Sequence, residues 1–82
     1  MQLEKRFKDL VERWPSAFVS RTDVRKFSGG ALTTKSLANH DSLGTGPAER
    51  FRVGRKICYP VEALALWMQS RATECPRKVR GC

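Results

Sequence analysis

Four cationic side chains lie close together in the second half of the chain and suggest the first chemistry. Arg50, Arg52, Arg55 and Lys56 have no acidic residue among them. Guanidinium and ammonium groups bind phosphate oxygens, and the alternation of these cations with apolar residues is typical of a β-hairpin rather than of a disordered tail. The segment therefore predicts a cationic hairpin that binds an anionic polymer.

The residues before the hairpin suggest a second chemistry, hydrogen bonding to base edges. A helix is expected to begin after Thr33 or Thr34, either of which could cap it, and to run to Leu43, where Gly44 provides the exit. Its polar face offers groups suited to a DNA major groove, although most short helices also turn a polar face to water. The residues of this face are Lys35, Ser36, Asn39 and His40.

Length and composition limit the possible functions. A chain of 82 residues has room for one domain with a modest core, and not for a large enzyme cleft. The net charge of +8 exceeds what solubility requires and predicts a polyanionic partner, either nucleic acid or an anionic membrane surface. The single histidine, which has no cysteine close to it in sequence, and the scattered acidic residues favour a binding protein over an enzyme, and no cofactor is expected.

The three cysteines, Cys58, Cys75 and Cys82, lack the paired spacing of a disulfide framework or a zinc finger. His40 would complete only an irregular ligand set, so no metal site is expected. No apolar stretch approaches the ~20 residues that span a bilayer, and the N-terminal residues do not resemble a secretion signal. These features predict a cytoplasmic protein in a reducing compartment.

The N-terminal segment has the apolar spacing of an amphipathic helix, expected over residues 2–14 and ended by Pro15. Charges of both signs on its polar face nearly balance, so a solvated surface explains them. The apolar face is expected to pack on the rest of the chain, but it could also dock into a second copy or a larger partner. Its residues are Leu3, Phe7, Leu10, Val11 and Trp14.

A short helix over residues 21–28 is expected next, with Ser20 as its N-cap and Gly29 and Gly30 at its end. Phe27 would face the core. Together with the helix that follows the glycines, this element predicts a helix-turn-helix. It also carries two further candidates for phosphate contacts, Arg25 and Lys26.

The alternation of side chains on either side of Gly54 sets the expected register of the hairpin. A three-residue loop over residues 54–56 would bring the apolar residues of both strands onto one buried face and turn Arg52 outward. The tip, with Arg55 and Lys56, would then form a wing that binds phosphates or enters a minor groove. The expected cross-strand pairs are Val53 with Ile57 and Phe51 with Tyr59.

The last regular element is a helix expected to begin at Pro60, where Glu62 favours the positive end of the helix dipole. Its apolar stripe would cover the hairpin and the helix-turn-helix, and Trp67 beside the stripe is expected to bury more area than any other side chain. After Arg71 the pattern gives way to a flexible basic tail, residues 72–82. The stripe consists of Val61, Leu64, Ala65 and Met68.

Two stretches of the chain resemble motifs of a known family. They are SLANHDSLGTGP at residues 36–47 and RVGRKICYPVEALALWM at residues 52–68. Similar motifs occur in the small AlpA-like and excisionase-type DNA-binding proteins, which have a MerR-like winged-helix domain, and the resemblance extends from Phe18 to Ser70. The chain departs from the family pattern at His40, where an aromatic residue often stands, and in its additional N-terminal helix.

The resemblance implies roles for individual residues. The second helix of the helix-turn-helix would read bases with residues at its N-terminal and outward positions, namely Thr34, Lys35, Ser36 and Asn39. Arg55 and Lys56 would form the wing. The family positions that are structural correspond here to Gly54, Tyr59, Leu64 and Trp67.

The sequence thus predicts a mostly α-helical fold with a small β-hairpin. An N-terminal helix, residues 1–17, precedes a winged helix-turn-helix domain, residues 18–71. The predicted function is sequence-specific binding of double-stranded DNA in the bacterial nucleoid, as a prophage or mobile-element excisionase or a small transcriptional regulator. Expected partners are integrase or RNA polymerase and further copies on DNA; the alternative is a protein-interaction module. The expected core is Phe27, Leu37, Val53, Gly54, Ile57, Tyr59, Leu64, Trp67 and Met68.

Overall fold

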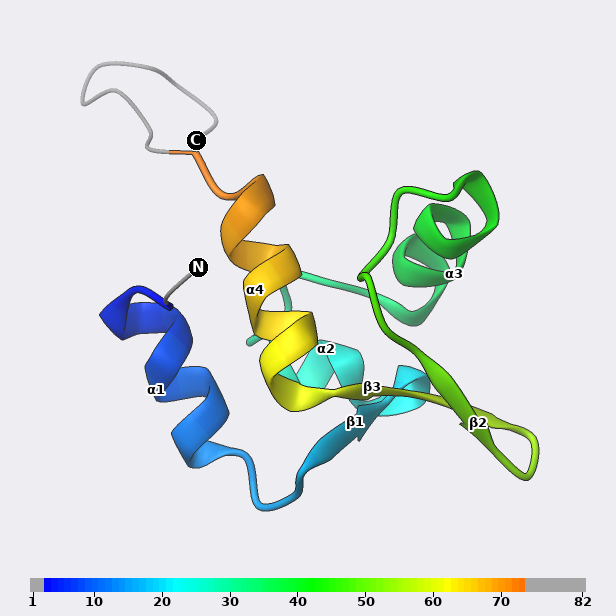
Figure 1. Cartoon of the computed structure of the whole chain (residues 1–82), viewed down its shortest axis with the longest axis horizontal. Coiled ribbons are helices and arrows are strands. Elements are labelled where there is room, and N and C mark those ends of the chain that lie inside the picture. The colour runs from blue at the N-terminus through cyan, green and yellow to red at the C-terminus, as the bar shows by residue number, and fades with distance from the viewer. Residues whose placement is uncertain (1–2, 74–82) are drawn as a thin grey trace.

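The computed structural model of the chain describes residues 3–73. Within them, a three-stranded antiparallel sheet packs with four α-helices and one short 3₁₀ helix, η1 (Figure 1). None of these helices is long and apolar enough to cross a membrane. In chain order the elements are α1 Lys5–Arg13, β1 Phe18–Ser20, η1 Arg21–Asp23, α2 Val24–Phe27, α3 Thr34–Leu43, β2 Phe51–Val53, β3 Lys56–Pro60 and α4 Val61–Arg71.

The sheet has one strand more than the predicted hairpin. Its order is β1-β3-β2, so β3 lies in the centre and pairs with both neighbours. In β1, Val19 lies opposite Tyr59, and both side chains are fully buried. The sequence did not predict this strand because β1 has only three residues and its partner lies far along the chain.

The predicted register of the hairpin is wrong. Gly54 and Arg55 form a two-residue turn, and Gly54 has the positive φ of 61° that a side chain would oppose. The prediction assumed that both apolar residues of β2 face the core, whereas the shorter turn places Arg52, and not Phe51 or Val53, on the face that it shares with Ile57. The observed pairs are Phe51 with Cys58, Arg52 with Ile57 and Val53 with Lys56.

This register exchanges the two faces of β2. Phe51 and Val53 lie on the outer face, where they are 39% and 54% exposed. The predictions that Val53 and Gly54 belong to the core are therefore wrong, since Gly54 lies in the exposed turn. Arg52 lies opposite Ile57, two residues from Tyr59, and therefore shares the inner face of the sheet. Because the Tyr59 side chain contacts α3, the inner face is also the face turned toward that helix.

The core lies between this inner face and the helices. Its largest fully buried members are Val19, Val24, Leu37, Tyr59 and Leu64. The predicted core positions Phe27, Leu37, Tyr59, Leu64 and Trp67 are buried, and Ile57 and Met68 are partly buried and pack against them.

Helix α1 packs along α4, as Figure 1 shows for the blue and the yellow-to-orange helices. Phe7 is buried, and the other apolar residues of its face pack against the same core. The Trp14 ring meets the Phe27 ring edge-on at 5.4 Å, and its Nε1 donates to the Phe18 carbonyl at 3.0 Å. The predicted docking of this face on the rest of the chain is confirmed.

The helix ends test the predicted caps. The Thr33 side chain accepts a hydrogen bond from the Ser36 amide at 3.0 Å, and Gly44 ends α3 with φ of 76°, as predicted. Ser20, in contrast, caps no backbone amide and instead bonds to the Asp23 carboxylate. Pro60 ends β3, so α4 begins one residue later than expected. Of the predicted tail, residues 74–82 lie outside the described part.

Candidate nucleic-acid interface

Helix α3 presents an exposed polar ridge on the side away from its buried residue Leu37. Lys35, Asn39 and Ser42 follow each other at helical spacing and are all exposed. The helix is held in place by Leu37, which is fully buried, and by the Thr33 cap. At the end of the ridge, Leu43 is 75% exposed. The ridge therefore combines hydrogen-bonding groups with one free apolar side chain.

The predicted base-reading residues fall into two groups. Lys35 and Asn39 lie on the ridge, and their side chains make no hydrogen bond or ion pair within residues 3–73. Thr34 is exposed, but its hydroxyl donates to the Arg21 carbonyl at 3.1 Å and so joins α3 to η1. Ser36 is only half-exposed beside the cap. Lys35 and Asn39 are thus the residues best placed for an external ligand.

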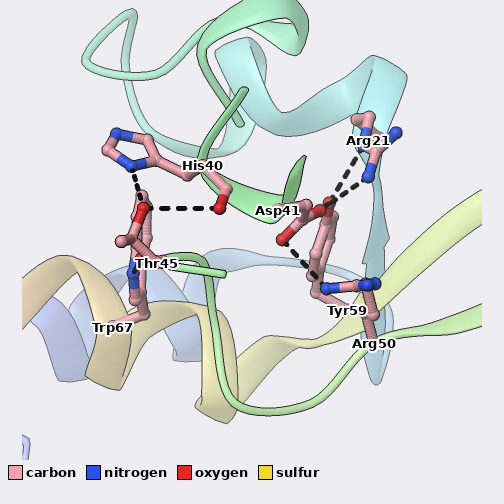
Figure 2. Close-up of polar contacts among 7 residues, drawn as sticks. All are labelled: Arg21, His40, Asp41, Thr45, Arg50, Tyr59 and Trp67. Atoms are coloured by element: carbon pink, nitrogen blue, oxygen red, sulfur yellow. Dashed lines mark hydrogen bonds and ion pairs between the residues drawn. The ribbon is translucent and has the colours of Figure 1, made fainter. Parts of the chain in front are cut away.

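His40 lies on the inward side of α3, where it contacts α4. Its Nδ1 lies 3.0 Å from Oγ1 of Thr45, and its ring meets the Trp67 ring edge-on at 5.2 Å. The Trp67 Nε1 in turn donates to the Thr45 carbonyl at 2.9 Å, and Figure 2 shows the Trp67 side chain beside Thr45. These contacts give His40 a role in joining α3, the following loop and α4, rather than a position on the exposed ridge.

A buried carboxylate connects α3 with the sheet. The Asp41 side chain is only 5% exposed, and its Oδ2 accepts hydrogen bonds from the Tyr59 hydroxyl and from Nη2 of Arg21, the latter at 2.6 Å. Nε of Arg21 also donates to the Tyr59 oxygen at 3.0 Å. This closed set of contacts, which we call the Asp41 junction, joins α3, β3 and η1 (Figure 2).

The second oxygen of Asp41 lies close to two further residues, Arg50 and Gly46. Oδ1 is buried and has no hydrogen bond in the described part of the chain, but Nη1 of Arg50 lies 3.5 Å from it. Arg50 is half-exposed and immediately precedes β2, so the junction reaches the base of the hairpin. A Cβ at Gly46 would lie 2.1 Å from Oδ1, so only glycine fits at this point of the loop.

The junction shifts the ionisation of its members. Burial, and then the hydrogen bond to Asp41, raise the pKa of Tyr59 from 10.0 to about 12. For Arg21, burial acts to lower the pKa, but the hydrogen bonds to Tyr59 and Asp41 outweigh it and raise the pKa overall. At neutral pH the Arg21 guanidinium of the junction is therefore charged and the Tyr59 phenol is neutral.

The cations of the hairpin have different surroundings. Arg52, Arg55 and Lys56 are exposed, and none forms an ion pair with a carboxylate of residues 3–73. Arg25 and Lys26 on α2 are likewise exposed and unpaired there. Cations without counter-charges retain their full capacity for phosphate. The structure thus leaves all five predicted phosphate ligands available.

Sequence reasoning missed the Asp41 junction and the exposed residues Ser42 and Leu43. Periodicity alone places Asp41 on the same side of α3 as Leu37, which was a signal of an inward carboxylate. Its partners Arg21 and Tyr59 lie 20 and 18 residues away and carry no local signal. No set of three or more metal-ligating side chains is present among the described residues.

No protein-family model matches the chain, and no curated protein matches it either.

Proposed function

We propose that the chain is a sequence-specific double-stranded DNA-binding protein, with α3 as the reading helix and the β2–β3 hairpin as a wing. The observation that carries the proposal is that the Asp41 junction fixes α3 to the sheet whose inner face bears Arg52. Groups suited to bases and groups suited to phosphates therefore belong to one rigid unit. Such a division of contacts is general in DNA recognition.

The order of the elements supports a winged helix-turn-helix. A short helix, α2, is followed by a glycine-containing turn, α3 and the hairpin, and α4 covers the inner side. The motifs at residues 36–47 and 52–68 resemble those of AlpA-like and excisionase-type proteins with a MerR-like domain. By that resemblance the protein acts as a recombination directionality factor, with an integrase as partner, or as a transcriptional regulator that contacts RNA polymerase.

Bases and phosphates are assigned to different residues. Lys35 and Asn39 read base edges in the major groove, since they are the free polar side chains of the predicted reading face. Thr34 and Ser36, near the first turn of α3, would contact the phosphates beside that groove. The backbone contacts come from Arg25, Lys26, Arg52, Arg55 and Lys56.

The test is a titration of labelled genomic duplexes, followed by fluorescence anisotropy at several salt concentrations. Salt-dependent binding with one duplex clearly preferred supports the proposal, and it also delivers the site. Absence of binding at low salt would overturn it. A footprint of tandem sites at a recombination locus favours the excisionase role, and a single promoter site favours the regulator.

The reading role of α3 has its own test. Asn39→Ala should lose about 1–3 kcal/mol of binding free energy on the preferred duplex and much less on random duplex, because a lost base contact affects only the specific complex. Glu12→Gln, an exposed polar change on α1, is the control and should leave both affinities unchanged. An equal loss on both duplexes would assign Asn39 to the backbone instead.

The alternative of a protein-interaction module receives less support. It needs the apolar face of α1 to be free, but Phe7 is buried and Leu10, Val11 and Trp14 pack against the core. A mass that stays monomeric over a wide concentration range in light scattering would agree with this packing. Concentration-dependent association that is lost in Leu10→Ala would favour the alternative.

A further inference from the structure

The tip of the hairpin forms a narrow two-stranded ribbon. Strand β1 pairs only with Cys58, Tyr59 and Pro60, so the part of the hairpin from Arg52 to Ile57 has no third strand beside it. Figure 1 shows this part extending away from the helices. The turn contains only Gly54 and Arg55, which keeps the tip thin. A ribbon end of this kind reaches surfaces that a helix cannot.

An apolar side chain stands at this tip. Val53 is the last residue of β2 and is 54% exposed, and it belongs neither to the core nor to the residues that pack against it. It lies directly opposite Lys56 and is followed closely by Arg55, both exposed and unpaired within the described part. The fold gains little from a valine here, because a polar residue would serve an exposed strand end equally well.

Apolar residues flanked by cations match one surface of duplex DNA. In the minor groove, apolar side chains pack on sugars and press between base pairs, while neighbouring cations bind the phosphates on either side. Such wedges partly unstack one base step and bend the duplex toward the major groove. Steps of a pyrimidine followed by a purine unstack most easily, so they accept a wedge at the lowest cost.

We propose that Val53 is a minor-groove wedge that opens one pyrimidine–purine step beside the sequence read by α3. The inference rests on the proposed DNA binding and adds a second source of specificity to it. Arg55 and Lys56 bind the two backbones across the groove, and Val53 enters between them. The preferred site then contains a flexible step that no polar side chain reads.

The experiment uses the full-length protein and its preferred duplex, labelled at both ends for energy transfer. A 2-aminopurine is placed in turn at each step flanking the α3 site, since its fluorescence rises when a base unstacks. The wild type should bend the duplex by about 20–90° and enhance the fluorescence at one step only. Val53→Thr keeps the shape and the branching but replaces one methyl group by a hydroxyl, and it should lose most of the bend and of the enhancement.

Two further variants complete the test. Val53→Ile keeps an apolar tip and should retain the bend, whereas Phe51→Leu changes an exposed apolar residue on the same face but farther from the tip and should also retain it. If Val53→Thr bends and unstacks the duplex as the wild type does, the wedge is wrong while DNA binding stands. If the wild type binds no duplex, the proposed function itself fails. Unchanged circular dichroism shows that each variant is folded.

Discussion

The Asp41 junction and the hairpin tip both contain cationic side chains, but the surroundings of these side chains are opposite. At the junction, Arg21 is 23% exposed and both of its bonded partners belong to the chain. At the tip, Arg55 and Lys56 are exposed and have no counter-charge in residues 3–73. The difference lies in whether a carboxylate is within reach. An arginine near a buried carboxylate supports the fold, and one without it is available to a ligand.

The two regions should also differ in what their loss costs. A charge removed from a buried pair leaves its partner desolvated and uncompensated, which is expensive. Removal of a charge from an exposed site leaves no buried partner without compensation, so the free energy of unfolding changes little. The comparison therefore predicts large effects on stability at the junction and effects confined to DNA binding at the tip.

Removal of the central carboxylate should have the largest effect. Asp41→Asn leaves Arg21 partly buried beside Tyr59 without its ion pair, and it should lower the free energy of unfolding by about 3–5 kcal/mol in urea denaturation. Glu49→Gln is the matched control, because Glu49 is an exposed carboxylate in the adjoining loop, and it should stay within about 0.5 kcal/mol of wild type. Equal stability of the two variants would show that the junction is not stabilising.

A steric clash within the junction should have the second largest effect on stability. In Gly46→Ala the new Cβ would lie 2.1 Å from Oδ1 of Asp41, so the carboxylate or the loop must shift, at a cost of about 1–3 kcal/mol. Gly29→Ala separates the steric from the backbone effect, because Gly29 has a positive φ but open space around it. Only Gly46→Ala should disturb the ionisation of Tyr59. A Tyr59 titration that Gly46→Ala leaves unchanged would contradict the close approach.

The sequence predicted the elements that are determined by neighbouring residues, and it missed those that depend on residues far along the chain. Helix α3 has local signals at both ends, Thr33 and Gly44, and was placed correctly. The core positions of α4 follow from helical periodicity alone. Strand β1 was missed because three residues give no periodic pattern. The segment is extended because it pairs with β3, where Val19 lies opposite Tyr59, far along the chain.

The candidate site was predicted less completely than the helices. The cations of the hairpin were recognised because their charge is evident from the sequence, without knowledge of any contact to a distant residue. The face on which each residue of β2 lies was predicted wrongly. It depends on the length of the turn, which has two residues rather than three, and this difference of one residue moves every side chain of β2 to the opposite face. The Asp41 junction joins segments 18 to 38 residues apart, and no local pattern encodes such a contact.

The ionisation of Tyr59 gives a third measurement. Tyr59 is the only tyrosine of the chain, so the ultraviolet absorbance of phenolate reports on it alone. Its pKa should be about 12 in the folded protein against 10.0 unfolded. Because the folded pKa is the higher, the neutral phenol contributes its full stability below pH 10, and this contribution is lost as the pH rises toward 12.

The Asp41→Asn variant tests how much Asp41 contributes to the raised pKa of Tyr59. Loss of the carboxylate removes the hydrogen bond and the charge of Asp41, both of which raise the pKa of Tyr59. Burial, which raises this pKa, then remains against the contacts of Arg21, which lower it, so the midpoint should fall. The same measurement on Glu49→Gln should reproduce the wild type. A midpoint near 10 in the folded wild type would mean that the phenol is not held in the junction.

The smallest effect on stability, and the most specific on binding, is expected at the tip. Arg55→Ala and Lys56→Ala should each change the free energy of unfolding by less than about 0.5 kcal/mol, since neither side chain has a partner among the described residues. Each should nevertheless lower the slope of log affinity against log salt by about one, because one phosphate contact fewer releases one counterion fewer. Lys8→Ala, an exposed cation on α1, is the control and should leave the slope unchanged. If all three variants lower the slope equally, the positive charge acts as a diffuse field, and the contrast between junction and tip does not extend to DNA binding.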